Sequence, residues 1–408
     1  MAKKLFWRRK RRFVLAALLT AALLLAGIAL YEAFPVMAPR DAGLTVAGER
    51  ALPLSRVAVY GEHALLYAEA RQEAPEPACL WLEEINLYRQ SPDGGDEAAP
   101  DNAGEQPSLS LICGETINQG LCLWQLPPGR YSFDYQGQPL IAADFTPLEG
   151  YTIPRQGKRK HWRFSAGEPD GLLRLSIAEA ATLPAGYCDI YLDAGHGGTD
   201  GGALAFGRVE AEENRKAALY FTERLSALGF VVMVSPFGGQ VAESGDNPYM
   251  PGARIDSIYR SRAAYLISNH LNGGGGKKSG FQIYTSVKAD NAWAEQVAAA
   301  FTQAGWHANN GNWGLVGDGM YKRWSRDNYH SGRDYYFILR ESGGYALSPY
   351  RYQILNQEMA AQLRRGPEGM LLEYLFLDNA NDLNYWDGHY RDLIDAAVAG
   401  CLAYWQAP

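Results

Sequence analysis

Residues 188–229 read as an apolar strand, a glycine-rich loop and an amphipathic helix, and this order constrains the fold more than any other stretch of the chain. The strand is "CDIYLDAG", and the loop "HGGTDGGA" surrounds one histidine with glycines and aspartates. In the helix "EAEENRKAALYFTERLSAL", apolar side chains repeat on one face, and Gly229 follows its end. Further strand and helix candidates alternate down the chain: "FVVMVSP", "AYLISNH", "GFQIYTS", "NAWAEQVAAAFTQAGW", "GMLLEYLFL" and "YRDLIDAAVAGCLAYW". The alternation predicts an α/β domain over 186–408, with a mainly parallel twisted sheet flanked by helices.

Three polar residues stand where predicted strands end, and a fourth stands at the start of the first helix. His196, His270 and Glu373 are the strand-end residues, and Glu210 begins the helix. Ligands of parallel α/β sheets gather at the carboxyl ends of the strands. Two imidazoles and one carboxylate are typical of a catalytic zinc shell with an open fourth position, and a further carboxylate beside it is suited to move protons. The pattern predicts a metal-dependent hydrolytic site.

Several blocks in a fixed order give the chain a family resemblance over residues 188–383. "DAGHGGTDGGA" is followed by Glu210 with Asn214 four residues later, and Arg254 stands sixteen residues before His270 in "SNHLN". "GFQIYTS" and "LLEYLFLDNANDL" complete the series. The sequence resembles the zinc-dependent N-acetylmuramoyl-L-alanine amidases, which cleave bacterial peptidoglycan.

The resemblance implies a role for each matching residue. His196, Glu210 and His270 would be the zinc ligands, and Glu373 would be the catalytic general acid and base. The implied reaction is hydrolysis, by zinc-activated water, of the amide between N-acetylmuramic acid and L-alanine. Glu212 and Glu213 are rivals to Glu210, but only Glu210 puts Asn214 and Gly229 in phase with the family pattern.

Other residues near these blocks have two interpretations each. Arg254 and Asn272 are candidate substrate-binding residues, although Arg254 could instead pair with an acid on the protein surface. Asp193 and Asp200 could orient a ligand histidine or form turns. The glycines would let the backbone approach the metal where a Cβ would intrude. The chain departs from the family pattern at Asn269, Leu271 and 374–375.

Two other functions use the same residues. A zinc carboxypeptidase or other peptidase would need the same shell, because that shell serves amide hydrolysis in general. A catalytically impaired peptidoglycan-binding protein is the non-enzymatic alternative. The formal net charge of −7 makes a nucleic-acid partner improbable.

The N-terminus predicts a membrane anchor. Residues 1–12 carry seven basic residues and no acid, and residues 13–30 carry no charge. Eighteen apolar residues at about 1.5 Å each form a helix of roughly 27 Å, close to the hydrocarbon thickness of a bilayer. We therefore expect a cytoplasmic tail at 1–12, a single-pass signal anchor at 13–31, a linker at 32–52 and an extracytoplasmic catalytic domain. A signal peptide cleaved near 33–38 is the alternative.

Residues 53–185 predict a small all-β module, sandwich-like, made of short strands separated by Pro- and Gly-containing breakers. Its role is open: it could position the enzyme on the wall, bind a regulator or cover the active site. Cys79 could pair with Cys113 or Cys122, or the five cysteines could be buried free thiols.

Overall fold

The computed structural model describes residues 52–69, 79–82, 84–90, 107–112, 116–142, 145–167, 171–236, 254–323, 334–339 and 365–406. Residues Arg50–Pro408 form one compact unit. The predicted tail (1–12), anchor (13–31) and linker (32–52, except Leu52) lie outside the described residues. Within the ranges above, no helix is both long enough and apolar enough to cross a membrane.

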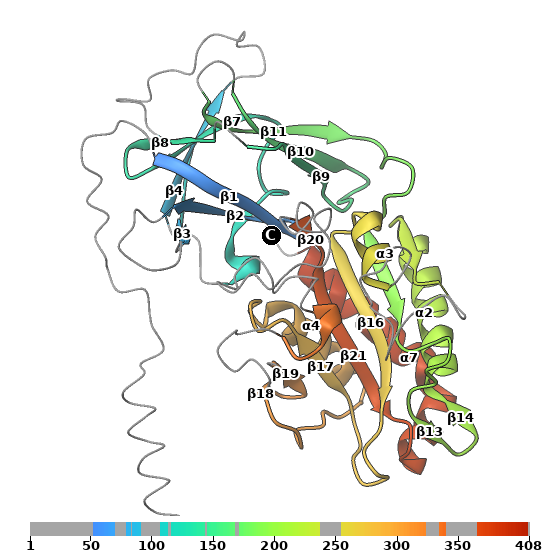
Figure 1. Cartoon of the computed structure of the whole chain (residues 1–408). Coiled ribbons are helices and arrows are strands. Elements are labelled where there is room, and N and C mark those ends of the chain that lie inside the picture. The colour runs from blue at the N-terminus through green and yellow to red at the C-terminus, as the bar shows by residue number, and fades with distance from the viewer. Residues whose placement is uncertain are drawn as a thin grey trace, which may run out of the picture. The chain divides into compact units, whose positions relative to one another are not determined.

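The described residues between 188 and 406, called the α/β part, are built on a sheet of seven strands in the order β15-β12-β16-β21-β17-β19-β18. These are β12 (Ile190–Ala194), β15 (Val232–Val234), β16 (Tyr265–Asn272), β17 (Gln282–Thr285), β18 (Leu315–Gly317), β19 (Met320–Tyr321) and β21 (Glu368–Phe376). Figure 1 shows β16 and β21 side by side at its centre.

The strand directions make the sheet mixed. Strands β15, β12, β16 and β21 are parallel, as the alternation of strands and helices predicts. Strand β17 runs antiparallel to β21, and β18 runs antiparallel to β19. The reason lies in the connection after β16: residues 273–281 contain no helix, and a short connection of this kind returns the chain in the opposite direction.

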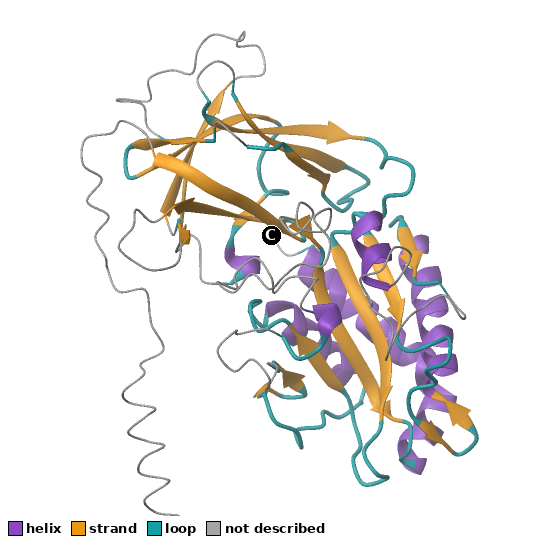
Figure 2. Cartoon of the chain, viewed as in Figure 1, coloured by secondary structure: helices purple, strands orange, loops and turns teal. Residues whose placement is uncertain are grey.

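Helices cover both faces of this sheet (Figures 1 and 2). Helices α2 (Glu210–Ala227), α4 (Ala292–Gln303) and α7 (Ala380–Trp405) contribute to one hydrophobic cluster, together with Ile190 and Leu192 of β12. Helices α3 (Arg254–Ser261) and α5 (Phe337–Leu339) contribute to the cluster on the other face, where Tyr191 points. The alternation along β12 thus separates two cores, one on each side of the sheet.

Helix α7 begins ten residues before the segment that its apolar pattern predicts. The side chain of Asn379 accepts hydrogen bonds from the backbone N–H groups of Asn381 and Asp382 at its start. An N-cap of this kind satisfies N–H groups that have no partner within the helix.

The β-rich part comprises the described residues from 52 to 180, and its strands join one connected sheet of twelve strands. They are β1 (Leu52–Tyr60), β2 (His63–Glu69), β3 (Cys79–Trp81), β4 (Glu84–Gln90), β5 (Leu109–Ile112), β6 (Leu121–Cys122), β7 (Gly129–Tyr135), β8 (Gln138–Ile141), β9 (Leu148–Tyr151), β10 (Arg159–Ala166) and β11 (Leu173–Ala180), with β20 (Arg365–Gly366) as the twelfth. A one-turn 3-10 helix, Ile117–Gln119, precedes β6.

Strand β1 joins two parts of this connected sheet. The start of β1 pairs with β8 at Leu52↔Leu140, whereas the rest of β1 pairs with β2. The register between β1 and β2 is irregular between Leu54 and Arg56. Cys122 is a free thiol, so the pairing of Cys79 with Cys122 is not formed; Cys113 lies outside the described residues.

Buried polar contacts attach the β-rich part to the amino ends of the central α/β strands. Glu62 is fully buried, where it accepts hydrogen bonds from Arg155 and from the hydroxyl of Tyr265, the first residue of β16. Arg159 pairs with Asp189, which directly precedes β12. Strand β20, one residue before β21, pairs with β1. The carboxyl ends of the same strands lie at the opposite edge of the sheet, and the predicted metal ligands are found there.

Candidate metal centre

The glycine-rich loop after β12 brings its histidine close to the other predicted ligands. His196 adopts a positive φ of 62°, which turns the chain sharply. A Cβ on Gly195 would lie 2.2 Å from the ring of His270. A Cβ on Gly202 would lie 2.5 Å from the Glu210 carboxylate, and Gly202 also has a positive φ of 68°. Glycine is therefore required at both positions by close approach, as predicted from the composition of the loop.

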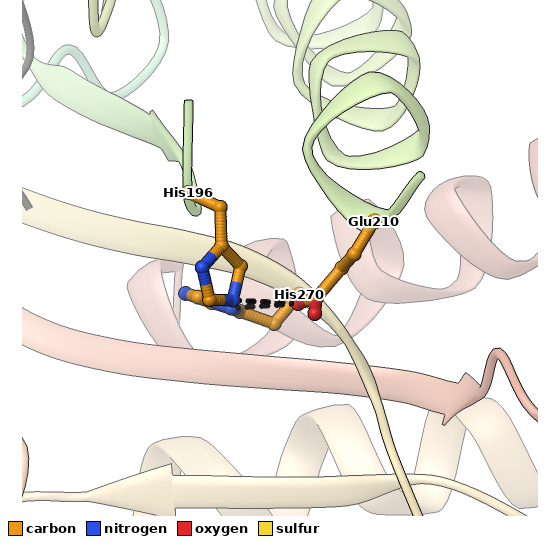
Figure 3. A group of neighbouring side chains, drawn as sticks. All are labelled: His196, Glu210 and His270. Carbon is orange, nitrogen blue, oxygen red and sulfur yellow. Dashed lines mark hydrogen bonds and ion pairs between the residues drawn. The ribbon is translucent and has the colours of Figure 1, made fainter. Parts of the chain in front are cut away.

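His196, Glu210 and His270 converge as predicted (Figure 3). The distance between Nε2 of His196 and Oε1 of Glu210 is 3.1 Å, and that between Nδ1 of His270 and the same oxygen is 3.0 Å. One donor atom from each residue lies within 4.8 Å of the others. Two imidazole nitrogens and one carboxylate oxygen at such separations can share a single zinc ion.

Glu210 is the buried centre of this group. It is the first residue of α2, and its two oxygens accept hydrogen bonds from the backbone N–H groups of Ala203 and Leu271. The side chain of Asn214, one turn further along α2, also donates to it. Burial raises the pKa of Glu210, but the hydrogen bonds and charges of the two histidines outweigh burial and hold the pKa below its ordinary value. The carboxylate is therefore kept ionised, as a metal ligand must be.

Asp200 orients the ring of His196. Its Oδ2 lies 3.0 Å from Nδ1 of His196, and its Oδ1 accepts the backbone N–H of Gly202. A carboxylate on one ring nitrogen fixes the tautomer that presents the other nitrogen to a metal. Asp193, the other candidate, instead accepts hydrogen bonds from Ser268 and Arg254.

Arg254 lies beneath the loop, where only 2 % of it is exposed. It pairs with Asp193, and it donates to the backbone carbonyls of Ala194 (3.0 Å) and His196 (2.7 Å). The acid that was expected as its alternative partner is present, but in the interior and not on the surface. These contacts fix the backbone on both sides of Gly195; substrate binding by Arg254 stays a prediction.

Glu373 lies on the strand next to His270. The two residues are register partners in the parallel pair β16–β21, so their side chains point to the same face of the sheet. Oε2 of Glu373 is buried and has no hydrogen-bond partner. Burial, and then the charge of Glu210, raise the pKa of Glu373 well above its ordinary value. A carboxyl group in this state is suited to hold and release a proton.

The remaining candidates have local partners. Asn272 donates to Gln282 and accepts the N–H of Gly273, and its role in substrate binding stays a prediction. Glu212 is exposed, whereas Glu213 is buried and bonded to Arg208, Lys216 and Trp386. Neither glutamate belongs to the cluster with the two histidines.

Sequence reasoning missed the residues on the far side of Glu373. Arg323 and Tyr336 follow β19 in the chain, and both interact electrostatically with Glu373. Tyr284 of β17 does the same. Residues 312–339 contain no motif that predicts this placement.

Comparisons with known proteins agree with the geometry. The family model described as N-acetylmuramoyl-L-alanine amidase (Amidase_3) matches residues 190–402, slightly more than half of the chain. The uncharacterized protein YqiI of Bacillus subtilis (strain 168) is 28 % identical over 113 residues; the match spans 28 % of this chain and about half, 51 %, of that protein.

Solved amidase structures are also similar to this chain. An N-acetylmuramoyl-L-alanine amidase from Clostridium difficile 630 has 19 % identity and a TM-score of 0.38, with 55 % of this chain and 99 % of that chain covered. AmiC2 of Nostoc punctiforme has 18 % identity and a TM-score of 0.37, with 53 % and 97 % covered. Because the family match runs from β12 into α7 and includes His196, Glu210, His270 and Glu373, the resemblance is confirmed, and the chain belongs to the N-acetylmuramoyl-L-alanine amidase family.

Proposed function

We propose that this protein is a zinc-dependent N-acetylmuramoyl-L-alanine amidase that hydrolyses the amide between N-acetylmuramic acid and L-alanine in peptidoglycan. One observation carries the proposal: a His–Glu–His cluster lies beside a buried glutamate that has no partner for one of its oxygens. Burying an oxygen without a hydrogen-bond partner is unfavourable unless a ligand or a reacting group supplies that partner.

The residues present fit a zinc ion. The donor set is two nitrogens and one oxygen, and the family is typically zinc-dependent. His196, Glu210 and His270 would hold the ion, with Glu210 supplying the negative charge. Zinc bound there supplies Lewis acidity for the attack of water on an amide.

Glu373 is the proton carrier in this proposal. Its carboxylate would accept the proton of the attacking water, and its carboxylic acid would then return that proton to the departing amine of L-alanine. The raised pKa of Glu373 favours the second step, because a buried acid gives up its proton readily to a more basic amine. The loop held by Arg254 keeps His196 in place during both steps.

The test compares two glutamates of the same strand in the full-length protein. Glu373→Gln is expected to abolish the release of new L-alanine amines from peptidoglycan. Glu368→Gln, at the other end of β21, is the matched control and is expected to keep the activity. Zinc content, measured by mass spectrometry, should be near one ion per chain in the wild type and in both variants.

The rival functions give different results in this assay. A peptidase would release amines from residues other than L-alanine and leave the sugar substituted. A wall-binding protein would bind peptidoglycan but release no amine in any of the three forms.

Membrane anchoring through 13–31 is part of the proposal and is supported by the apolar run behind seven basic residues. Cell fractionation and a reporter fused after Pro408 test it. We expect the protein in the membrane fraction and the reporter outside the cytoplasm; a soluble protein with a cytoplasmic reporter would contradict anchoring.

A further inference from the structure

Among the described residues, Arg323 is an arginine whose charge acts on Glu373. Strand β12 precedes His196, and the neighbouring strand β16 contains His270. The next strand in the sheet is β21, which contains Glu373, and it is followed by β17 and β19. Arg323 stands two residues after the end of β19. The strands that lead to the candidate ligands and the strand that leads to Arg323 therefore flank β21 on opposite sides.

The guanidinium of Arg323 is held in one orientation. It stacks over the rings of Tyr284 (4.8 Å to the centroid) and Trp313 (5.1 Å). Its Nε donates to the carbonyl of Trp313, and its Nη1 donates to the hydroxyl of Tyr336, both at 3.3 Å. Aromatic stacking and two hydrogen bonds preorganise the planar group.

One nitrogen of this guanidinium remains without a partner. Nη2 of Arg323 is buried, and within the described part of the chain it has no hydrogen-bond partner. Oε2 of Glu373 is buried and unpartnered as well. A buried charged donor without an acceptor among the described residues is unfavourable, and a bound substrate can supply that acceptor.

The chemistry of the proposed reaction identifies which half of the substrate lies beside Glu373 and Arg323. Glu373 returns a proton to the departing amine, so the peptide half must lie on the side of Glu373, and the sugar half on the side of the glycine-rich loop. The carboxyl group of the N-acetylmuramoyl half is consumed in the amide that is cleaved. Free carboxylates therefore belong to the peptide half, and a guanidinium binds them strongly.

We propose that Arg323 is a specificity-determining residue that binds a carboxylate of the peptide on the leaving-group side of the scissile amide. This inference rests on the proposed amidase function. It selects peptides whose residue after L-alanine carries free carboxylates over peptides in which these groups are carboxamides.

The test uses the full-length protein and two muramoyl peptides that differ only in this amidation. The wild type is expected to show the lower KM for the free carboxylate. Arg323→Met should raise that KM about ten- to a hundredfold, as expected for the loss of a charge-assisted hydrogen bond, and should leave the KM for the amidated peptide nearly unchanged. Arg323→Lys should restore part of the preference. Arg391→Met, on the exposed surface of α7, is the control and should change neither constant.

The outcomes separate the two proposals. A wild type that cleaves both peptides with the same KM, or an Arg323→Met variant that loses both activities equally, overturns the role of Arg323 and leaves the amidase function intact. A wild type that cleaves neither peptide nor peptidoglycan overturns the amidase function, and this inference with it. If Arg323→Met fails to fold, the wild-type preference and Arg323→Lys still decide.

Discussion

The hydroxyl of Tyr374 on β21 donates a 2.7 Å hydrogen bond to Oδ1 of Asn269 on β16. Both side chains are fully buried, and both stand where the chain departs from the family pattern. The amide of Asn269 in turn donates to the backbone carbonyl of Asp193 at the end of β12. The two departures are therefore one feature: a polar residue introduced into the core together with the partner that satisfies it.

Tyr374→Phe is expected to lower the free energy of unfolding by about 1–3 kcal/mol, because it leaves the buried Asn269 oxygen without a donor. Chemical denaturation measures the loss. In the Tyr374→Phe background, Asn269→Ala should lower the free energy of unfolding by less than it does in the wild type, because the hydrogen bond is already absent. Tyr220→Phe serves as the control, because this tyrosine is only partly buried and its hydroxyl donates a longer hydrogen bond, 3.3 Å, to Asp395. If the two substitutions lowered the free energy of unfolding by strictly additive amounts, the hydrogen bond between Tyr374 and Asn269 would be contradicted.

The candidate metal site could be predicted from the sequence because metal binding requires particular residue types at fixed positions. A ligand at a strand end must have the right type, and its loop must contain glycine where another side chain approaches, as at Gly195 and Gly202. The alternation of strands and helices likewise predicts the parallel core of the sheet.

Other features have no local signal. The apolar run of β17 does not encode its direction, which depends on the connection before it. Strand β20 has two residues and is defined only by its pairing with β1. The spacing to His270 singles out Arg254 but does not show that it lies beneath the loop, and no motif marks Arg323; tertiary packing determines both positions.

Asp200→Ala is expected to weaken zinc binding about 10–100-fold, because the Nδ1 atom of His196 loses the carboxylate that orients it. Competition with a chelator of known zinc affinity measures the change. Asp318→Ala removes a surface carboxylate that bonds only Asn310 and is the control. Unchanged affinity in Asp200→Ala would show that Asp200 only shapes the turn.

Arg254→Met is expected to destabilise the fold by about 3–5 kcal/mol, because it leaves Asp193 buried without its counter-charge. The variant should also bind zinc more weakly, since the carbonyls of Ala194 and His196 are released. Thermal unfolding and zinc titration report the two effects. If Arg254 instead binds substrate, stability and zinc affinity will be near those of the wild type and only KM will rise.

Glu368 is expected to make stability depend on pH. Burial first, with the charges of Asp290 and Glu62, raises its pKa from 4.5 to about 8, although a hydrogen bond from Tyr404 opposes the shift. Between these values the folded state holds a proton that the unfolded state has lost, so the free energy of unfolding falls as pH rises from about 4.5 to about 8.

Glu368→Gln removes this titration. The variant should melt at a higher temperature than the wild type at pH 8 and at nearly the same temperature at pH 5. Glu179→Gln, an exposed glutamate of β11, should follow the wild-type profile. If the melting temperatures of Glu368→Gln and the wild type changed with pH in parallel, Glu368 would be ionised in the folded protein.

The buried pair of Arg159 and Asp189 predicts that the β-rich part and the α/β part unfold together. Arg159 on β10 is 7 % exposed at its side chain and Asp189 is 1 % exposed. Arg159→Met should lower the free energy of unfolding by about 3 kcal/mol, since Asp189 would keep its backbone contact with Val231 but lose its counter-charge. Arg163→Met, on the same strand, breaks an ion pair whose side chains are about half exposed, and should cost less than about 1 kcal/mol. Calorimetry of the full-length protein should show one transition in each variant, shifted down only in Arg159→Met. Two separated transitions, with only one of them shifted, would mean that the two parts are independent domains and that the contacts of Glu62 and β20 do not couple them.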